Sequence, residues 1–181
     1  MIRLVPPCLE MLPGYADALR RGWSPDTTRD LSGEQLARLR REGPAEFLRD
    51  LADPGRPAVT TDGRAVPRLP GLVFWVEDSG FCGTINLRFQ LDGEELPVHV
   101  SGHVGYSIVR WKQRAGRATA ALRLLLPVAR GCGLERVMVT CDADNVPSQR
   151  VIEKAGGTRI DDAPPLRAGD PIKRRWWVAT R

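Results

Sequence analysis

Residues 110–119, Arg-Trp-Lys-Gln-Arg-Ala-Gly-Arg-Ala-Thr, lie between an apolar run that ends at Val109 and a helical pattern that begins at Ala118. Small residues at 115, 116 and 118 allow a ligand to approach the backbone of this turn closely. Free N–H groups at the start of a helix attract anions, and the helix dipole strengthens that attraction. Four basic side chains surround the turn. The stretch therefore predicts a binding site for a ligand that carries phosphates.

A second block of residues follows at the spacing of another strand and helix. Residues 134–141 form an apolar run rich in Val and Met, which indicates a buried strand. Asn145 comes soon after this strand, and Ser148 lies in the first turn of a helix expected over about 147–155. Asn145 is a favourable residue type for a helix N-cap. The same side chain can also contact a ligand, and the two roles are compatible.

Together the two blocks resemble the core of the GNAT superfamily, the acyl-CoA N-acyltransferases. Gln113-x-x-Gly116-x-Ala118 is similar to the Q/R-x-x-G-x-G/A signature of that superfamily, and residues 145–157 are similar to its second conserved block. The resemblance implies an α/β (α+β) fold in which a mixed, mostly antiparallel central sheet is flanked by helices, in a single domain over residues 1–181. It also implies an N-acetyltransferase that moves an acetyl group from acetyl-CoA to a primary amine by direct attack in a ternary complex.

The resemblance further implies which residues hold acetyl-CoA. Main-chain groups of Ile108 and Val109 are expected at the pantetheine arm, with Arg110 following at the strand end. Asn145 is expected at the pantetheine amides, and Ser148 faces the same side of the helix start. The turn expected to surround the pyrophosphate consists of Gln113, Arg114, Ala115, Gly116, Arg117, Ala118 and Thr119.

The second block departs from the superfamily at the residue that commonly protonates the leaving thiolate. Ile152 stands where many members have a tyrosine, and its side chain has no proton to donate. Ser148 and Tyr106 are the alternative donors. We expect solvent to protonate the thiolate instead, because a thiolate whose thiol pKa is about 8.5 is a tolerable leaving group near neutral pH.

The general base expected from the superfamily, an acidic residue on the third strand, is also missing. His103 is the residue of that strand that titrates near neutral pH, which makes it the candidate base. The alternative for His103 is a hydrogen-bonded polar residue at the start of a strand. Glu77 and Asp78 are weaker candidates, because both lie in an expected turn.

Asn86 and Arg88 alternate onto one face of their expected strand. They face either the acceptor cleft, as substrate-binding residues, or solvent. Residues 83–88 and 102–107 resemble a bacterial group of acetyltransferases whose substrate is not assigned. The acceptor therefore stays open between a small-molecule amine and a peptide amine.

The hydrophobic pattern predicts the elements that position these residues. Ser32 and Gln35 have the spacing of a capping box, with Ser32 as the helix N-cap. The stretch 53–70, which holds four prolines, is expected to be a loop, either a lid or a disordered segment. The expected strands are 2–5, 72–76, 81–91, 101–109, 134–141, 158–161 and 172–178, and the expected helices are 9–21, 32–41, 44–51, 118–130 and 147–155.

Composition narrows the remaining functional classes. The chain has 181 residues, 42% of them hydrophobic and 27% charged, as in ordinary globular proteins, and no apolar run reaches the length of a membrane span. Its four cysteines lack metal-binding spacing, so we expect reduced thiols, no metal and a cytoplasmic protein. The net charge of +5 arises from scattered residues, so we expect no nucleic-acid partner. Whether the chain forms a homodimer stays open.

Two further function classes compete with the acetyltransferase. The absent tyrosine and the absent acidic base are also compatible with a non-catalytic module or sensor that binds acyl-CoA. Nucleic-acid binding rests on the positive charge alone, and it would need a salt-dependent interaction with DNA as its minimum support.

Overall fold

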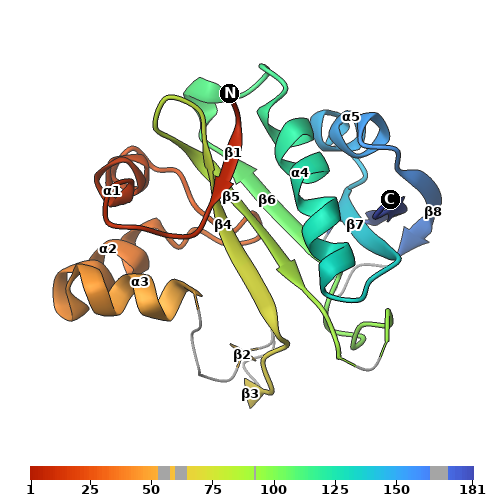
Figure 1. Cartoon of the computed structure of the whole chain (residues 1–181), viewed down its shortest axis with the longest axis horizontal. Helices are drawn as coiled ribbons and strands as arrows, with labels where there is room; N and C mark the ends of the chain where they lie inside the picture. Colours follow the sequence, from red (N-terminus) through yellow and green to blue (C-terminus); the bar gives the residue numbers. More distant parts are fainter. Residues whose placement is uncertain (53–57, 60–64, 92, 164–170) are drawn as a thin grey trace.

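A seven-stranded sheet runs through the molecule, with its strands in the order β1-β4-β5-β6-β7-β9-β8 (Figure 1). The computed structural model describes residues 1–52, 58–59, 65–91, 93–163 and 171–181. All pairs of neighbouring strands are antiparallel except β6 and β7, which run parallel. The strands of this sheet are β1 (Arg3–Val5), β4 (Gly71–Glu77), β5 (Phe81–Arg88), β6 (Val104–Ile108), β7 (Arg136–Asp142), β8 (Thr158–Ala163) and β9 (Lys173–Ala179).

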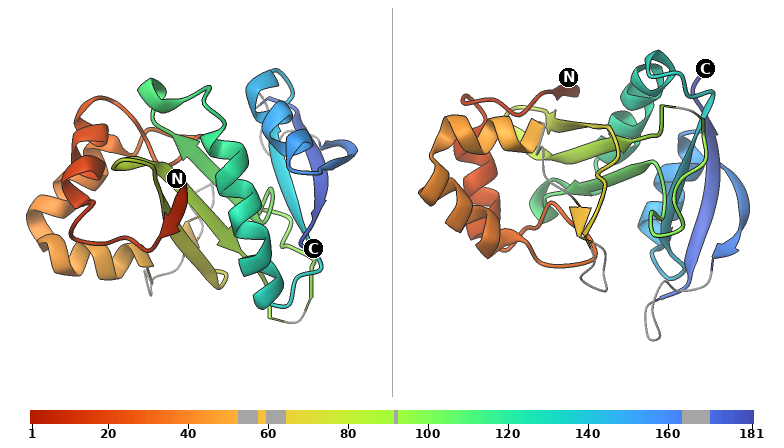
Figure 2. Two further views of the ribbon diagram at one scale, coloured as in Figure 1. Left: turned by 45° about the horizontal axis from the view of Figure 1, so that its top comes forward. Right: turned by 90° about the horizontal axis from the view of Figure 1, so that it is seen from below.

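Five α-helices cover the sheet from both sides in the part of the chain that is described. Trp75 and Val76 are neighbours on β4 and point to opposite faces, and each is fully buried in a different core. The core around Trp75 is formed with the first three helices, and the core around Val76 with the last two (Figures 1 and 2). The helices are α1 (Leu12–Arg20), α2 (Ser32–Glu42), α3 (Pro44–Ala52), α4 (Arg117–Gly131) and α5 (Val146–Lys154).

Local sequence explains how α4 forms and where it lies. Leu122, Leu125 and Ala129 recur at helical spacing, and all three are fully buried against the sheet. Pro127 lies inside the helix, and Gly133, with a φ of 87°, lies just beyond its end. The expected helix over 118–130 is thus observed, extended by one residue at each end.

The expected capping box at Ser32 is wrong. Leu31 is the N-cap of α2 and Ser32 is the first residue of the helix. Asp30 provides the side-chain acceptor instead, because its Oδ1 accepts a hydrogen bond of 2.8 Å from the Ser32 N–H. Asp30 and Ser32 are both residue types that can accept a hydrogen bond at the start of a helix, and the backbone conformation decides which of the two does so.

The expected loop over 53–70 lies largely outside the described residues. Two short paired strands, β2 (Ala58–Val59) and β3 (Ala65–Val66), lie within this stretch. The alternatives of a lid or a disordered segment concern mainly residues 53–57 and 60–64, which are not described.

The feature of the sheet that matters most for function is the short contact between β6 and β7. These two strands pair only at Val104 and Val139, whereas β6 pairs with β5 along its whole length. Beyond Val104 the two strands diverge, so that β7, β8 and β9 turn away from the other four strands of the sheet (Figure 2). The main chain of β6 therefore has an edge that β7 does not cover.

Candidate functional site

The turn between β6 and α4 has a conformation that few residue types adopt easily. A short 3-10 turn over Arg110–Lys112 follows β6, and Arg114 and Gly116 then take positive φ values of 64° and 75°. Gly116 is the left-handed N-cap of α4, which explains why a residue without a Cβ stands there. The Gln113 side chain braces the turn, because its Nε2 donates a hydrogen bond of 2.9 Å to the Ile108 carbonyl.

This turn presents an uninterrupted run of free hydrogen-bond donors. Within the described part of the chain, the backbone N–H groups of residues 114–119 have no hydrogen-bond acceptor. The first bond into α4 is that from the Ala120 N–H to the Gly116 carbonyl, at 3.0 Å. Such donors lie at the positive end of the helix dipole, so the turn is suited to an anion of the size of a pyrophosphate.

The Arg117 side chain does not contribute to this anion site as a free cation. Its Nε and Nη2 lie 3.0 and 2.8 Å from Asp78 Oδ2, in the turn between β4 and β5. Lys112 is held by the same turn, because its Nζ donates to the carbonyls of Asp78 and Ser79. Both cations therefore fix the turn in place, and Arg117 can reach a ligand only through its backbone N–H.

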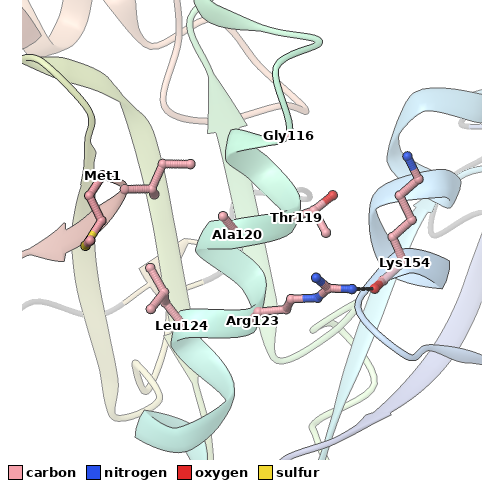
Figure 3. A pocket seen from close by; sticks show the side chains of 8 residues that line it. Met1, Gly116, Thr119, Ala120, Arg123, Leu124 and Lys154 are labelled. Carbon is pink, nitrogen blue, oxygen red and sulfur yellow. Dashed lines mark hydrogen bonds between the residues drawn. The ribbon is translucent and has the colours of Figure 1, made fainter.

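A cleft of about 590 Å³ opens beside the turn, along the first half of α4 (Figure 3). Arg123 and Lys154 bring positive charge to one side of it, and Arg123 also donates a hydrogen bond to the Lys154 carbonyl, which joins α4 to α5. The cleft is lined by Met1, Ile2, Gly116, Thr119, Ala120, Arg123, Leu124 and Lys154.

Tyr106 and Ser148, the two alternative proton donors, lie together across the gap between β6 and β7. The Tyr106 hydroxyl is 2.7 Å from Ser148 Oγ. Burial raises the pKa of Tyr106 to about 12, although the contact with Ser148 acts in the opposite direction. The phenol is therefore protonated at neutral pH and can donate a proton. Ile152, at the expected tyrosine position, is fully buried in the core with α4.

Asn145 is the N-cap of α5, as the sequence predicts. Its Oδ1 accepts a hydrogen bond of 3.1 Å from the Ser148 N–H. The side-chain amide is therefore oriented by its own helix. Within the described residues its Nδ2 has no partner, which leaves that donor for a ligand.

The main chain of Val109 is less accessible than expected. Its N–H donates to the Cys82 carbonyl at 2.9 Å, and its carbonyl accepts from the Lys112 N–H at 2.9 Å. The side chain is fully buried in the core with α1 and α3. With both polar groups occupied, Val109 is a poor partner for the pantetheine arm. Ile108 is restricted in part, since its carbonyl already accepts from Gln113.

His103 has a structural position, which argues against its expected role as the base. Its side chain is fully buried, and its Nδ1 accepts a hydrogen bond of 2.9 Å from the Met138 N–H. The His103 N–H donates in return to the Met138 carbonyl at 2.8 Å, so this residue joins β6 to β7. A proton could reach Nδ1 only if the hydrogen bond from the Met138 N–H were broken.

The two carboxylates considered as weaker bases, Glu77 and Asp78, bind Arg3 and Arg117, and these arginines lower the pKa values of the two carboxylates.

The burial of His103 leads to a prediction about stability. Burial lowers the pKa of the folded imidazole below its ordinary 6.5, although the nearby Glu94 opposes this shift. As the pH falls below 6.5, the imidazole of the unfolded chain binds a proton that the folded chain does not yet bind, so the free energy of unfolding decreases. We expect His103→Asn, which keeps an acceptor for Met138, to reduce this loss between pH 7 and about pH 5. Urea unfolding at several pH values measures it, and equal pH slopes for the two proteins would contradict the assignment.

Asn86 and Arg88 lie together on the face of the sheet that α1, α2 and α3 cover. Asn86 pairs with Gly105 on β6, and Arg88 lies two residues further along the same face of β5. The Arg88 Nη2 donates a hydrogen bond of 3.0 Å to Asn86 Oδ1. Nearer α1, the same face is covered by Trp23, whose Nε1 donates to Ser107 Oγ at 2.9 Å.

Sequence reasoning missed the residues that brace the turn. Asp78 lies 39 positions before its partner Arg117, and no spacing rule connects the two. Arg123 and Lys154 were likewise not expected at a cleft, although both are basic residues on helices next to the predicted site.

None of the helices in the described part of the chain is long and apolar enough to span a bilayer.

Comparisons with known proteins identify the fold. A family model described as "Acetyltransferase (GNAT) domain" matches residues 37–158. The structure of Mycobacterium smegmatis RimJ in complex with a CoA disulfide is 19% identical, with a TM-score of 0.66 over 98% of this chain and 81% of that chain. The microcin C7 self-immunity acetyltransferase MccE, in complex with acetyl-CoA and AMP, is 13% identical, with a TM-score of 0.64 over 98% and 92%.

A third solved structure has a similar likeness in fold to this chain. RimL, a ribosomal L7/L12 α-N-protein acetyltransferase in complex with coenzyme A, is 14% identical, with a TM-score of 0.64 over 98% of this chain and 93% of that chain. A comparison with curated protein sequences found no match. At these identities the structural likeness supports the fold, and the predicted mixed α/β class with a mostly antiparallel sheet is confirmed.

Proposed function

Because this chain belongs to the GNAT family of acetyltransferases, we propose that it transfers an acetyl group from acetyl-CoA to a primary amine while both substrates are bound. One observation carries the proposal: the run of free backbone N–H groups over 114–119 lies at the end of the strand β6, whose edge β7 leaves uncovered. The first feature is suited to a pyrophosphate, and the second leaves room for a long flexible arm beside β6.

The residues around the turn would divide the binding of acetyl-CoA between them. The N–H groups of residues 114–119 would bind the pyrophosphate, with the exposed Arg110 and Arg114 nearby. Arg123 and Lys154 would add positive charge along the cleft. The Nδ2 of Asn145 would donate to the pantetheine arm.

The amine would attack the acetyl carbonyl, so that a carbon–nitrogen bond forms and the carbon–sulfur bond breaks. The Tyr106 hydroxyl would give its proton to the departing thiolate, with Ser148 fixing its position. The attacking nitrogen would lose its proton to water, because His103 is sealed inside the sheet. Much of the rate gain would come from holding the two reactants together, an effect that can supply about 7–11 kcal/mol in a well-aligned site.

Two measurements on the purified protein test this proposal. Titration calorimetry with CoA tests binding at the turn, and release of free CoA from acetyl-CoA with a panel of primary amines tests the transfer. We expect CoA to bind and at least one class of amine to release it. If CoA binds and no amine releases it, the chain is a non-catalytic acyl-CoA-binding module. If CoA does not bind, both functions are excluded.

A further inference from the structure

Arg88 is a partly buried cation without an anionic partner among the described residues. Its guanidinium makes one side-chain hydrogen bond, to Asn86 Oδ1. Among the described residues, no carboxylate lies within ion-pair distance of Arg88. Burial lowers the pKa of Arg88, and of the two charges that act on it from further away, Asp26 raises that pKa and Arg68 lowers it. The Oδ1 of Asp26 is itself occupied by the N–H and the hydroxyl of Thr28, at 2.7 and 2.6 Å.

The other partly buried arginines among the described residues each lie within ion-pair distance of a carboxylate, although Arg174 reaches Asp162 only at 3.8 Å. Arg38 is paired with Glu42 at 3.0 Å, and Arg117 with Asp78 at 2.8 Å. Arg175 donates to Asp161 at 2.6 Å. A charge withdrawn from water without a partner is costly, so proteins usually pair such groups. Among the described residues Arg88 departs from this pattern, because it is partly buried and no carboxylate lies within ion-pair distance of it.

The unused donors of Arg88 are accessible. The described side-chain polar atoms that are sealed from solvent and lack a partner include His103 Nε2 and Arg174 Nε, and no nitrogen of Arg88 is among them. The residue opposite Asn86 on β6 is Gly105. A Cβ at Gly105 would lie only 3.0 Å from Arg88 Nη2 and 3.2 Å from Asn86 Oδ1. A larger residue there would press against the pair, so glycine at this position makes room for the guanidinium beside Asn86.

The position of this pair relates it to the reaction centre. Gly105 directly precedes Tyr106, and the two residues point to opposite faces of β6. Tyr106 faces the gap towards α5, where its hydroxyl meets Ser148. Arg88 and Asn86 lie across the strand from it, on the side of the sheet that carries α1, α2 and α3. A ligand bound to Arg88 would therefore approach β6 from the face opposite the proton donor.

From this geometry we propose that Arg88, held in place by Asn86, binds an anionic group of the acceptor, a carboxylate or a phosphate. The acceptor is then an amine that carries a negative charge close to its amino group. Guanidinium groups bind both kinds of anion through paired hydrogen bonds, and the Nδ2 of Asn86 supplies a further donor. The inference rests on the acetyl transfer proposed above and names the class of its acceptor.

Matched amine pairs test this inference through the rate of CoA release. Amino acids are compared with their amides, and peptides that begin with Asp or Glu are compared with peptides that begin with Asn or Gln. Phosphoethanolamine is compared with ethanolamine. In each pair the two compounds are supplied at the same concentration of the unprotonated amino group. The three pairs separate a main-chain carboxylate, a side-chain carboxylate and a phosphate. We expect one anionic member to exceed its neutral partner in kcat/KM by about 10- to 100-fold, the usual range for one charge-assisted hydrogen-bonded contact.

Variants show whether Arg88 is responsible for the preference. Arg88→Gln should remove the preference by lowering kcat/KM much more for the anionic member of the pair than for the uncharged member, and Arg88→Lys should keep part of the preference. Arg20→Gln is the matched control, because Arg20 is exposed at the end of α1. Thermal unfolding and CoA titration confirm that each variant is folded. Equal rates for both members of every pair, or a preference that survives in Arg88→Gln, would overturn the inference.

A separate arm covers the case in which no amine releases CoA, which would contradict the proposed transfer and not the anion site. Acetate and phosphate are then titrated into the CoA-loaded protein while the side-chain Nε–Hε signal of Arg88 is followed by NMR. A saturable shift of that signal with one of the two anions supports the site. The absence of a shift with both anions rejects it.

Discussion

Replacing Gly116 by glutamate should weaken the binding of CoA by about 100-fold or more, while the protein stays folded. The new carboxylate would lie at the N-cap of α4, within the run of free N–H groups of residues 114–119. It would compete for these donors and repel the pyrophosphate, and each charge-assisted hydrogen bond lost costs about 1.5–3 kcal/mol. Titration calorimetry with CoA measures the effect.

Gly133→Glu provides a matched control for this experiment. Gly133 lies just beyond the other end of α4, and like Gly116 it is exposed, has a positive φ and has open space where a Cβ would be. Both substitutions therefore strain the backbone by a similar amount, about 1–3 kcal/mol. We expect Gly133→Glu to lose stability and to keep its CoA affinity. If both variants bind CoA as the unchanged protein does, the pyrophosphate does not lie at the turn.

The strand, turn and helix around Gly116 could be predicted because the signal is local. A strand, a turn of small residues and a helix follow one another within about twenty positions, and each can be recognised from hydrophobic periodicity and residue size. The same holds for Asn145, whose role as N-cap depends only on the three residues after it. Local patterns of this kind survive in the fold, because the packing of the helix and the chemistry of its cap favour the same conformation.

The role of His103 could not be predicted in the same way. Its type and position were compatible with a base and with a hydrogen-bonded polar residue at the start of a strand. The structure agrees with the second alternative, but the partner, Met138, lies 35 positions away on the strand next to it. Only the parallel alignment of β6 with β7 brings the imidazole to that backbone N–H. The pairing of Arg117 with Asp78 has the same cause, since it forms between two turns that are adjacent only in space.

The lack of an ion pair for Arg88 among the described residues could not be predicted from the sequence either. The alternation along β5 does not distinguish an arginine that faces solvent from one that is partly buried without an ion pair among the described residues. The difference depends on α1 to α3, which cover that face of the sheet, and on Gly105, which leaves space on the neighbouring strand. The charge balance of a site is a property of the assembled fold.

The proton donor for the leaving thiolate provides the second decisive test. From the sequence we expected solvent to serve, whereas the 2.7 Å contact between Tyr106 and Ser148 favours the phenol. Tyr106→Phe should slow the single-turnover transfer at least about tenfold and leave CoA affinity unchanged, because the hydroxyl matters mainly in the transition state. The loss should lie at or below the lower end of the usual contribution of a general acid, about 10²–10⁴-fold, because a thiolate leaves more readily than an alkoxide. Ser148→Ala should have a smaller effect, since it removes only the partner that orients the phenol.

Tyr15→Phe is the matched control, because Tyr15 is the second of the two tyrosines in the chain. Its hydroxyl is sealed in the core with α1 and α3, without a partner among the described residues, so removing it should leave the rate unchanged. Burial keeps the pKa of Tyr106 at about 12, so the phenol should stay protonated and produce no change in the rate profile between pH 6 and about pH 10. A Tyr106→Phe variant that transfers acetyl at the unchanged rate, with CoA affinity intact, would show that the thiolate takes its proton from solvent.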